Sequence, residues 1–160
     1  MDSTPTAVHR STMPSPVGSL ILSQGANGLE SLSWGDDEYN YDNGTNILAT
    51  ARSQLEAYFR GELKVFELPL APRGTPFQQK VWHGLRDIPY GTTVSYGALA
   101  QRLGTGPRAV ARACANNPLP IFIPCHRVVG ASGALTGYSG GTGVDTKRAL
   151  LGLEGAHPPS

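Results

Sequence analysis

A cysteine, a histidine and an arginine follow one another at residues 125–127. Because nearby cations favour the thiolate form of cysteine, the side chains of His126 and Arg127 place Cys125 to lose its proton and act as a nucleophile. Pro124 ends the apolar strand that we expect at residues 121–123, so the thiol should emerge in a turn. The alternative is a buried structural thiol, since free cysteine is among the most buried residue types.

The sequence does not favour a metal site or a disulfide. Cys114, Cys125 and His126 lack the paired spacing of zinc ligands, and the remaining histidines have no nearby partner: His9, His83 and His157. Two cysteines outside a Cys-x-x-Cys pair fit a reducing compartment. The N-terminus does not resemble a signal peptide, and no apolar run approaches the roughly 20 residues of a membrane helix. We therefore expect a cytoplasmic protein without metal, cofactor or membrane partner.

The charge of the chain is divided unevenly along its length. Of 160 residues, 33 are glycine or proline (20 and 13), which predicts a loop-rich globular chain. The net charge of +1 is the sum of two opposite values. Residues 1–70 carry −5 (four basic, nine acidic), and residues 71–160 carry +6 (nine basic, three acidic). No acidic residue lies between Asp87 and Asp145, where four arginines fall: Arg102, Arg108, Arg112 and Arg127. This stretch indicates either a surface that faces a polyanion or a buried segment rich in small residues.

The first 70 residues predict a small α+β domain without a cluster of titratable side chains. We expect residues 1–12 to be frayed, strands at 17–23 and 29–34 joined by a turn, and an acidic loop at 36–44. Apolar residues recur at helical spacing over 47–59, before Gly61. Residues 65–70 are typical of an edge strand that stops at Pro69.

Residues 71–76 are predicted to form a linker, and residues 77–160 a second, mostly helical domain. Its first helix should span 77–88. A helix capped by Ser95 runs to Leu103, and after the glycine turn at 104–106 another begins at Pro107. This pattern predicts a helix-turn-helix whose second helix carries Arg108 and several alanines, which would let it approach DNA closely. An ordinary packing pair of helices is the alternative.

The order of several short motifs identifies a resemblance that covers residues 74–155. The motif Pro124-Cys125-His126-Arg127-Val128 follows an Asn-Pro pair at 117–118 and precedes Tyr-Ser-Gly-Gly at 138–141. The match runs from Gly-Thr-x-Phe-Gln at 74–78 to Leu-Glu-Gly at 153–155. In these motifs the chain resembles the O6-alkylguanine-DNA alkyltransferase family. The resemblance implies an α+β fold, with a ribonuclease-H-like domain before a DNA-binding domain that holds the active-site cysteine loop.

The resemblance implies a role for each residue that matches the family's reaction. Cys125 would accept the alkyl group, and the product would be a thioether, so each molecule would react once. His126 would act as its base through a water molecule, and Glu154 would orient His126. Asn117 would connect the recognition helix to the active-site segment. Tyr96 would donate toward guanine N3 and help to rotate the nucleotide.

The resemblance also implies how the base and the DNA are held. Arg108 would fill the gap left by a flipped nucleotide in the minor groove. Tyr138 would form a pocket wall and Ser139 would bond the guanine O6 atom. The carbonyls of Cys125 and Val128 would accept from the exocyclic amine. Three further residues are assigned to the DNA and base site: Ser95, Cys114 and Arg112.

This chain departs from the family in its turn length and in one pocket wall. The segment between Tyr96 and Arg108 is two residues shorter than in many members, and Cys114 stands where some carry methionine.

We expect a monomer that binds duplex DNA through the minor groove and can cluster along it. A lesion-binding protein without transfer, a Cys-His hydrolase and a dimeric helix-turn-helix regulator are the alternatives.

Overall fold

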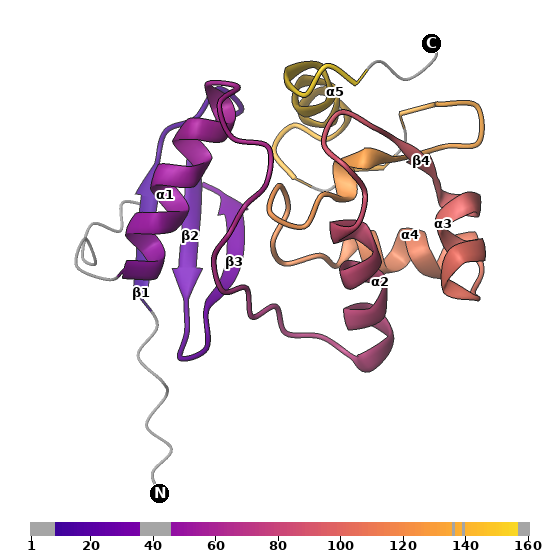
Figure 1. Cartoon of the computed structure of the whole chain (residues 1–160), viewed down its shortest axis with the longest axis horizontal. Coiled ribbons are helices and arrows are strands. Elements are labelled where there is room, and N and C mark those ends of the chain that lie inside the picture. Colours follow the sequence, from indigo (N-terminus) through magenta and orange to yellow (C-terminus); the bar gives the residue numbers. More distant parts are fainter. Residues whose placement is uncertain (1–8, 36–45, 136, 139, 157–160) are drawn as a thin grey trace, which may run out of the picture. The chain divides into compact units, whose positions relative to one another are not determined.

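The computed structural model describes residues 9–35, 46–135, 137–138 and 140–156. The chain forms two compact units, one up to Arg73 and one from Gly74 onward (Figure 1). The acidic segment predicted at 36–44 and Ser139 lie outside the described residues. In the described part of the chain, every helix is too short or too polar to cross a membrane.

The first unit is a three-stranded antiparallel sheet with one helix packed against it (Figure 1). Strand β2 (Leu20–Gln24) lies between β1 (His9–Met13) and β3 (Leu29–Trp34). Helix α1 spans Asn46–Phe59, close to the predicted 47–59. Its apolar residues and those of the sheet form a common core that includes Leu20, Leu22, Leu48 and Leu55.

Two expectations for this unit are wrong. Residues 9–12 are not frayed, because β1 pairs with β2 from His9 opposite Gln24 to Met13 opposite Leu20. Residues 65–70 do not form a strand, and Leu70 alone makes a bridge, to Leu29. The Gln54 side chain of α1 binds both backbone groups of Glu67, at 2.9 and 3.0 Å, so the middle of this segment is bound to the helix and only its end is bound to the sheet.

The second unit consists of four helices, a short 3-10 turn and one small parallel strand pair. Helix α2 spans Pro76–Arg86, α3 Tyr96–Leu103, α4 Pro107–Ala115 and α5 Val144–Leu153. Strand β4 (Val94–Ser95) pairs with β5 (Val128–Val129), which directly follows the 3-10 turn η1 (Cys125–Arg127). The strand pair therefore joins the start of α3 to the segment that carries the cysteine.

Helix α2 begins inside the segment predicted to be a linker. Thr75 is its N-cap, and the Thr75 hydroxyl accepts from the Gln78 amide at 3.1 Å. The Gln78 side chain accepts in return from the Thr75 amide at 2.9 Å, which completes a capping box. The Trp82 indole donates to the Ala113 carbonyl at 2.9 Å and so fixes α2 against α4.

Helices α3 and α4 form the predicted helix-turn-helix pair. The Ser95 hydroxyl caps α3 by accepting from the Ala98 amide at 3.0 Å. Gly104 ends α3 with a φ of 69°, a left-handed conformation that glycine adopts without strain. Pro107 then opens α4 at its first position. These local signals explain why the pair could be predicted from sequence.

Residues 121–123 are buried, as expected, but they form a tight turn and not a strand. Pro120 and Ile123 make an isolated bridge, and the Ile123 amide donates to the Leu119 carbonyl at 2.8 Å. Ile121 has a φ of 77°, a strained value for a β-branched residue. The turn leads through Pro124 into η1, which places Cys125 at the start of the 3-10 turn.

Candidate active site

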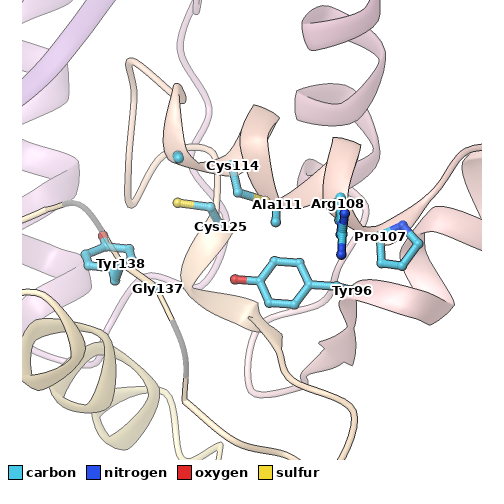
Figure 2. Close-up of a pocket in the computed structure, with 9 residues that line it drawn as sticks. Tyr96, Pro107, Arg108, Ala111, Cys114, Cys125, Gly137 and Tyr138 are labelled. Carbon is cyan, nitrogen blue, oxygen red and sulfur yellow. The ribbon is translucent and has the colours of Figure 1, made fainter.

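The predicted nucleophile opens into a cavity of about 520 Å³ next to α4. Figure 2 shows the lining side chains, which come from the start of α3, from α4, from η1 and from the segment at 137–138. The cavity is lined by Tyr96, Pro107, Arg108, Ala111, Cys114, Ala115, Cys125, Gly137 and Tyr138. Four other predicted site residues thus line the same cavity as Cys125, namely Tyr96, Arg108, Cys114 and Tyr138.

Asn117 holds the cysteine segment in place. Its side-chain amide donates to the Ile123 carbonyl at 2.9 Å, and its side-chain oxygen accepts from the Leu119 amide at 2.9 Å. The same side chain hydrogen-bonds to Cys125. Asn117 follows α4 by two residues, so it connects the recognition helix to the active-site turn, the position that the resemblance implies.

His126, Arg127 and Glu154 form a network that is closed to solvent. His126 Nε2 lies 2.8 Å from Glu154 Oε2. Arg127 donates to both Glu154 oxygens, through Nε at 2.8 Å and Nη2 at 3.0 Å. Its remaining Nη1 atom donates to the Ile88 carbonyl at 2.7 Å. A bidentate arginine keeps the buried carboxylate ionised, and the carboxylate fixes the histidine ring.

The pKa of the Cys125 thiol is raised, chiefly because the side chain is buried. The Asn117 hydrogen bond and the nearby Lys147 charge lower that pKa but do not overcome burial. The expectation that Arg127 favours the thiolate is wrong, because its guanidinium is bound to Glu154 and Ile88. Cys125 is therefore a thiol in the protein without DNA, and it needs a base.

His126 has the properties of that base. Burial lowers its pKa more than the Glu154 hydrogen bond raises it, so the ring is neutral at pH 7. A neutral ring bonded to a carboxylate through Nε2 carries its proton on Nε2 and a lone pair on Nδ1. Within the described residues, Nδ1 has no hydrogen-bond partner and is free to accept a proton.

Lys147 is a site residue that the sequence analysis missed. It is fully buried in α5, its ammonium lies 5.6 Å from the centre of the Tyr96 ring, and its charge acts on both cysteines. Burial lowers the pKa of Lys147, whereas the two thiols raise it. A signal was present, because Lys147 shares a helix face with Leu150, Leu151 and Glu154. A lysine on an apolar helix face is a candidate for a functional charge.

The remaining predicted residues lie elsewhere. Ser95 caps α3, and Val128 is a buried residue of β5, and neither side chain lines the cavity. Arg112 is exposed and lines a separate cavity of about 390 Å³ that also includes Phe77. The described residues contain no group of three or more histidine, cysteine or acidic side chains that could hold a metal ion.

Comparison with known families accounts for both units of the chain. The ribonuclease-like domain of 6-O-methylguanine DNA methyltransferase matches residues 8–72, and the DNA-binding domain of the same family matches residues 76–156. The chain belongs to the 6-O-methylguanine DNA methyltransferase family. Its DNA-binding domain is the unit that holds Cys125 and the helix-turn-helix pair.

Members of the methyltransferase family resemble this chain over nearly its full length. The methylated-DNA–protein-cysteine methyltransferase of Mycobacterium tuberculosis (strain H37Rv) is 44% identical over 96% of both chains. The constitutive enzyme of that name from Bacillus subtilis (strain 168) is 43% identical over 91% of this chain and 94% of its own. A crystal structure of the M. tuberculosis protein OGT in complex with DNA matches this chain with a TM-score of 0.82 and 45% identity. The match covers 95% of this chain and 96% of that one.

Proposed function

We propose that this chain repairs O6-alkylguanine in DNA by transferring the alkyl group to its own Cys125. The observation that carries the proposal is the position of Cys125, at the cavity beside α4 and next to the His126–Glu154 pair. A methyltransferase that acts on DNA needs a nucleophile, a base for its proton and a binding surface for the strand. All three are present in the DNA-binding domain of this chain.

In the transfer step, the Cys125 proton passes to His126 Nδ1 through a water molecule. The sulfur then attacks the alkyl carbon, and the bond from that carbon to guanine O6 breaks. The departing guanine anion takes up a proton from water on a ring nitrogen, and protonated His126 returns its proton to water. Tyr96 presents its hydroxyl to the cavity, where it can donate to the departing guanine (Figure 2). The thioether that forms has no route back to a thiol, so each molecule acts once.

Base flipping would bring the alkylated guanine into the cavity. A guanine inside a duplex hides its O6 alkyl group, so the nucleotide must leave the stack. Arg108 is exposed in the first turn of α4 and lines the cavity, which suits it to occupy the vacated place from the minor groove. The exposed Arg112 would contact phosphate, and the protein would bind DNA as a monomer, with clustering along the strand, in the cytoplasm.

A titration with excess substrate tests this function. A duplex that contains one O6-methylguanine is added in tenfold molar excess over the protein, and the amount of repaired guanine is measured over time. Transfer should stop at one guanine per protein molecule. Continued turnover would identify a hydrolase, and tight binding with no repaired guanine would identify a lesion-binding protein. Cys125→Ala is the matched control and should bind the duplex without repairing it.

A further inference from the structure

The cavity that holds the acceptor thiol also holds a second thiol. Cys114 from α4 and Cys125 from η1 both line it, and both are buried. Asn117 contacts both residues, since its amide donates to the Cys114 carbonyl at 3.2 Å and its side chain hydrogen-bonds to Cys125. Cys125 is close enough for its charge to raise the pKa of Cys114, and the Lys147 charge lowers the pKa of both thiols. The methyl-transfer mechanism uses only Cys125.

We propose that Cys114 is a second acceptor, which captures alkyl groups that carry a further leaving group. The substrate class is O6-alkylguanine with a haloalkyl or comparable substituent, the kind of lesion that bifunctional alkylating agents leave. This inference rests on the proposed transfer to Cys125. Its outcome is a bridge between the two sulfurs inside the protein, formed before the reactive group can reach DNA.

The chemistry proceeds in two displacements. In the first, Cys125 takes the alkyl carbon from guanine O6, and the halide remains at the far end of the group. In the second, the Cys114 sulfur attacks the carbon that carries the halide, a second sulfur–carbon bond forms, and halide leaves. The Cys114 proton passes to solvent, so the net products are guanine, hydrogen halide and a bis-thioether.

Proximity favours attack by Cys114 over attack by water. After the first displacement the electrophilic carbon is tethered to Cys125 within the cavity that Cys114 lines, which makes the attack intramolecular. Effective molarities for well-oriented intramolecular reactions reach about 10⁵–10⁸ M, far above the concentration of water.

The charges around Cys114 also bear on the second step. The pKa of the Cys114 thiol is raised to about 12, first by burial and then by Cys125, whereas the Lys147 charge lowers it. Lys147 therefore favours the thiolate of Cys114, as it favours that of Cys125.

The test uses the free base O6-[3-(chloromethyl)benzyl]guanine, in which the ring prevents the chloride end from closing onto guanine. The intact protein is incubated with this base, and its mass and peptide map are recorded. The expected product has lost both guanine and chloride and joins the peptides of Cys114 and Cys125. In Cys114→Ser the bridged fraction should fall at least tenfold, and the adduct on Cys125 should retain chlorine or carry a hydroxyl group.

Any of three results overturns the inference. The main wild-type product could be an adduct that carries a hydroxyl group or chlorine, or the bridged fraction in Cys114→Ser could equal that of the wild type. The third such result is a bridge that ends at Lys147. Cys114→Ala serves as a second variant if serine impairs folding. Methyl transfer from a duplex with O6-methylguanine is measured for each protein. Wild type that accepts methyl without bridging refutes only the second acceptor, whereas wild type that accepts no methyl refutes the proposed function itself.

Discussion

The Nε2 atom of His126 lies 2.8 Å from Glu154 Oε2, and both side chains are closed to solvent. The residues are 28 positions apart, in the 3-10 turn and directly after α5. Because Arg127 holds the same carboxylate through two hydrogen bonds, Glu154 stays ionised and directs the histidine proton to Nε2. The opposite ring nitrogen, Nδ1, then keeps the lone pair that is proposed to take the Cys125 proton.

The proposed flipping role of Arg108 can be separated from a structural role. Arg108→Ala should slow transfer from duplex DNA by roughly ten- to a thousandfold, since unstacking costs on the order of a few kcal/mol. Reaction with free O6-benzylguanine should stay nearly unchanged, because a free base needs no flipping. Single-turnover rates on both substrates provide the measurement, with the exposed Arg112→Ala as the control. Equal slowing on both substrates would assign Arg108 to the fold of the site.

Breaking the buried Arg127–Glu154 pair should strongly destabilise the second unit. Arg127→Ala leaves a buried carboxylate without its main partner and should lower the free energy of unfolding by about 3–5 kcal/mol. Arg148→Ala removes an exposed pair with Asp145, of 3.1 Å, and should cost about 0.2–1 kcal/mol. Urea unfolding of the two variants gives the comparison. Similar losses in both would show that Glu154 is stabilised without Arg127.

The buried thiol of Cys114 makes stability depend on alkaline pH. Its pKa is raised from 9.0 to about 12 in the folded protein, so above pH 9 the thiol ionises only in unfolded chains. Stability that is present below pH 9 is therefore lost as pH rises toward 12, by about 1.4 kcal/mol per pH unit. Urea unfolding at pH 8 and pH 10.5 should show a smaller loss in Cys114→Ala than in wild type. Parallel losses would mean that the Cys114 thiol is not shielded from water.

Lys147 should assist the acceptor through its charge. Lys147→Met keeps the side-chain volume and removes a cation that lowers the pKa of Cys125. The pKa of Cys125 should therefore rise, and the transfer rate at pH 7 should fall about tenfold for each unit of that rise. The rate profile should also move to higher pH, a change that loss of packing would not produce. Lys80→Met, at an exposed position of α2, is the control. A lower rate with an unshifted profile would refute the electrostatic role.

Local sequence signals predicted the helix-turn-helix well, because its caps act within a few residues. Ser95, Gly104 and Pro107 each have one dominant structural use, and the structure places all three accordingly. Strand β1 was missed because its sequence is polar, with only Ser11 and Met13 buried. Residues 65–70 alternate like a strand, but only Leu70 bridges the sheet, and Glu67 is bound by Gln54 of α1, which no local pattern indicates.

The sequence predicted which side chains would meet in the candidate site but not the electrostatics of that site. The resemblance brought Cys125, His126 and Glu154 together, and the structure confirms that His126 and Glu154 meet. Sequence adjacency suggested that Arg127 acts on the thiol, whereas the fold turns its guanidinium toward Glu154. The cation that does act on Cys125 is Lys147, 22 residues away in sequence and brought to the site by α5.

The most direct test of this account is the mass of the intact protein after reaction with a duplex that contains one O6-methylguanine. The account predicts a gain of one methyl group per molecule, and peptide mapping should locate it on Cys125, with Cys114 unmodified. His126 and Glu154 belong to the network beside Cys125 alone, which is why the two buried thiols should differ in this reaction. Several methyl groups per molecule, or a single one on Cys114, would contradict it.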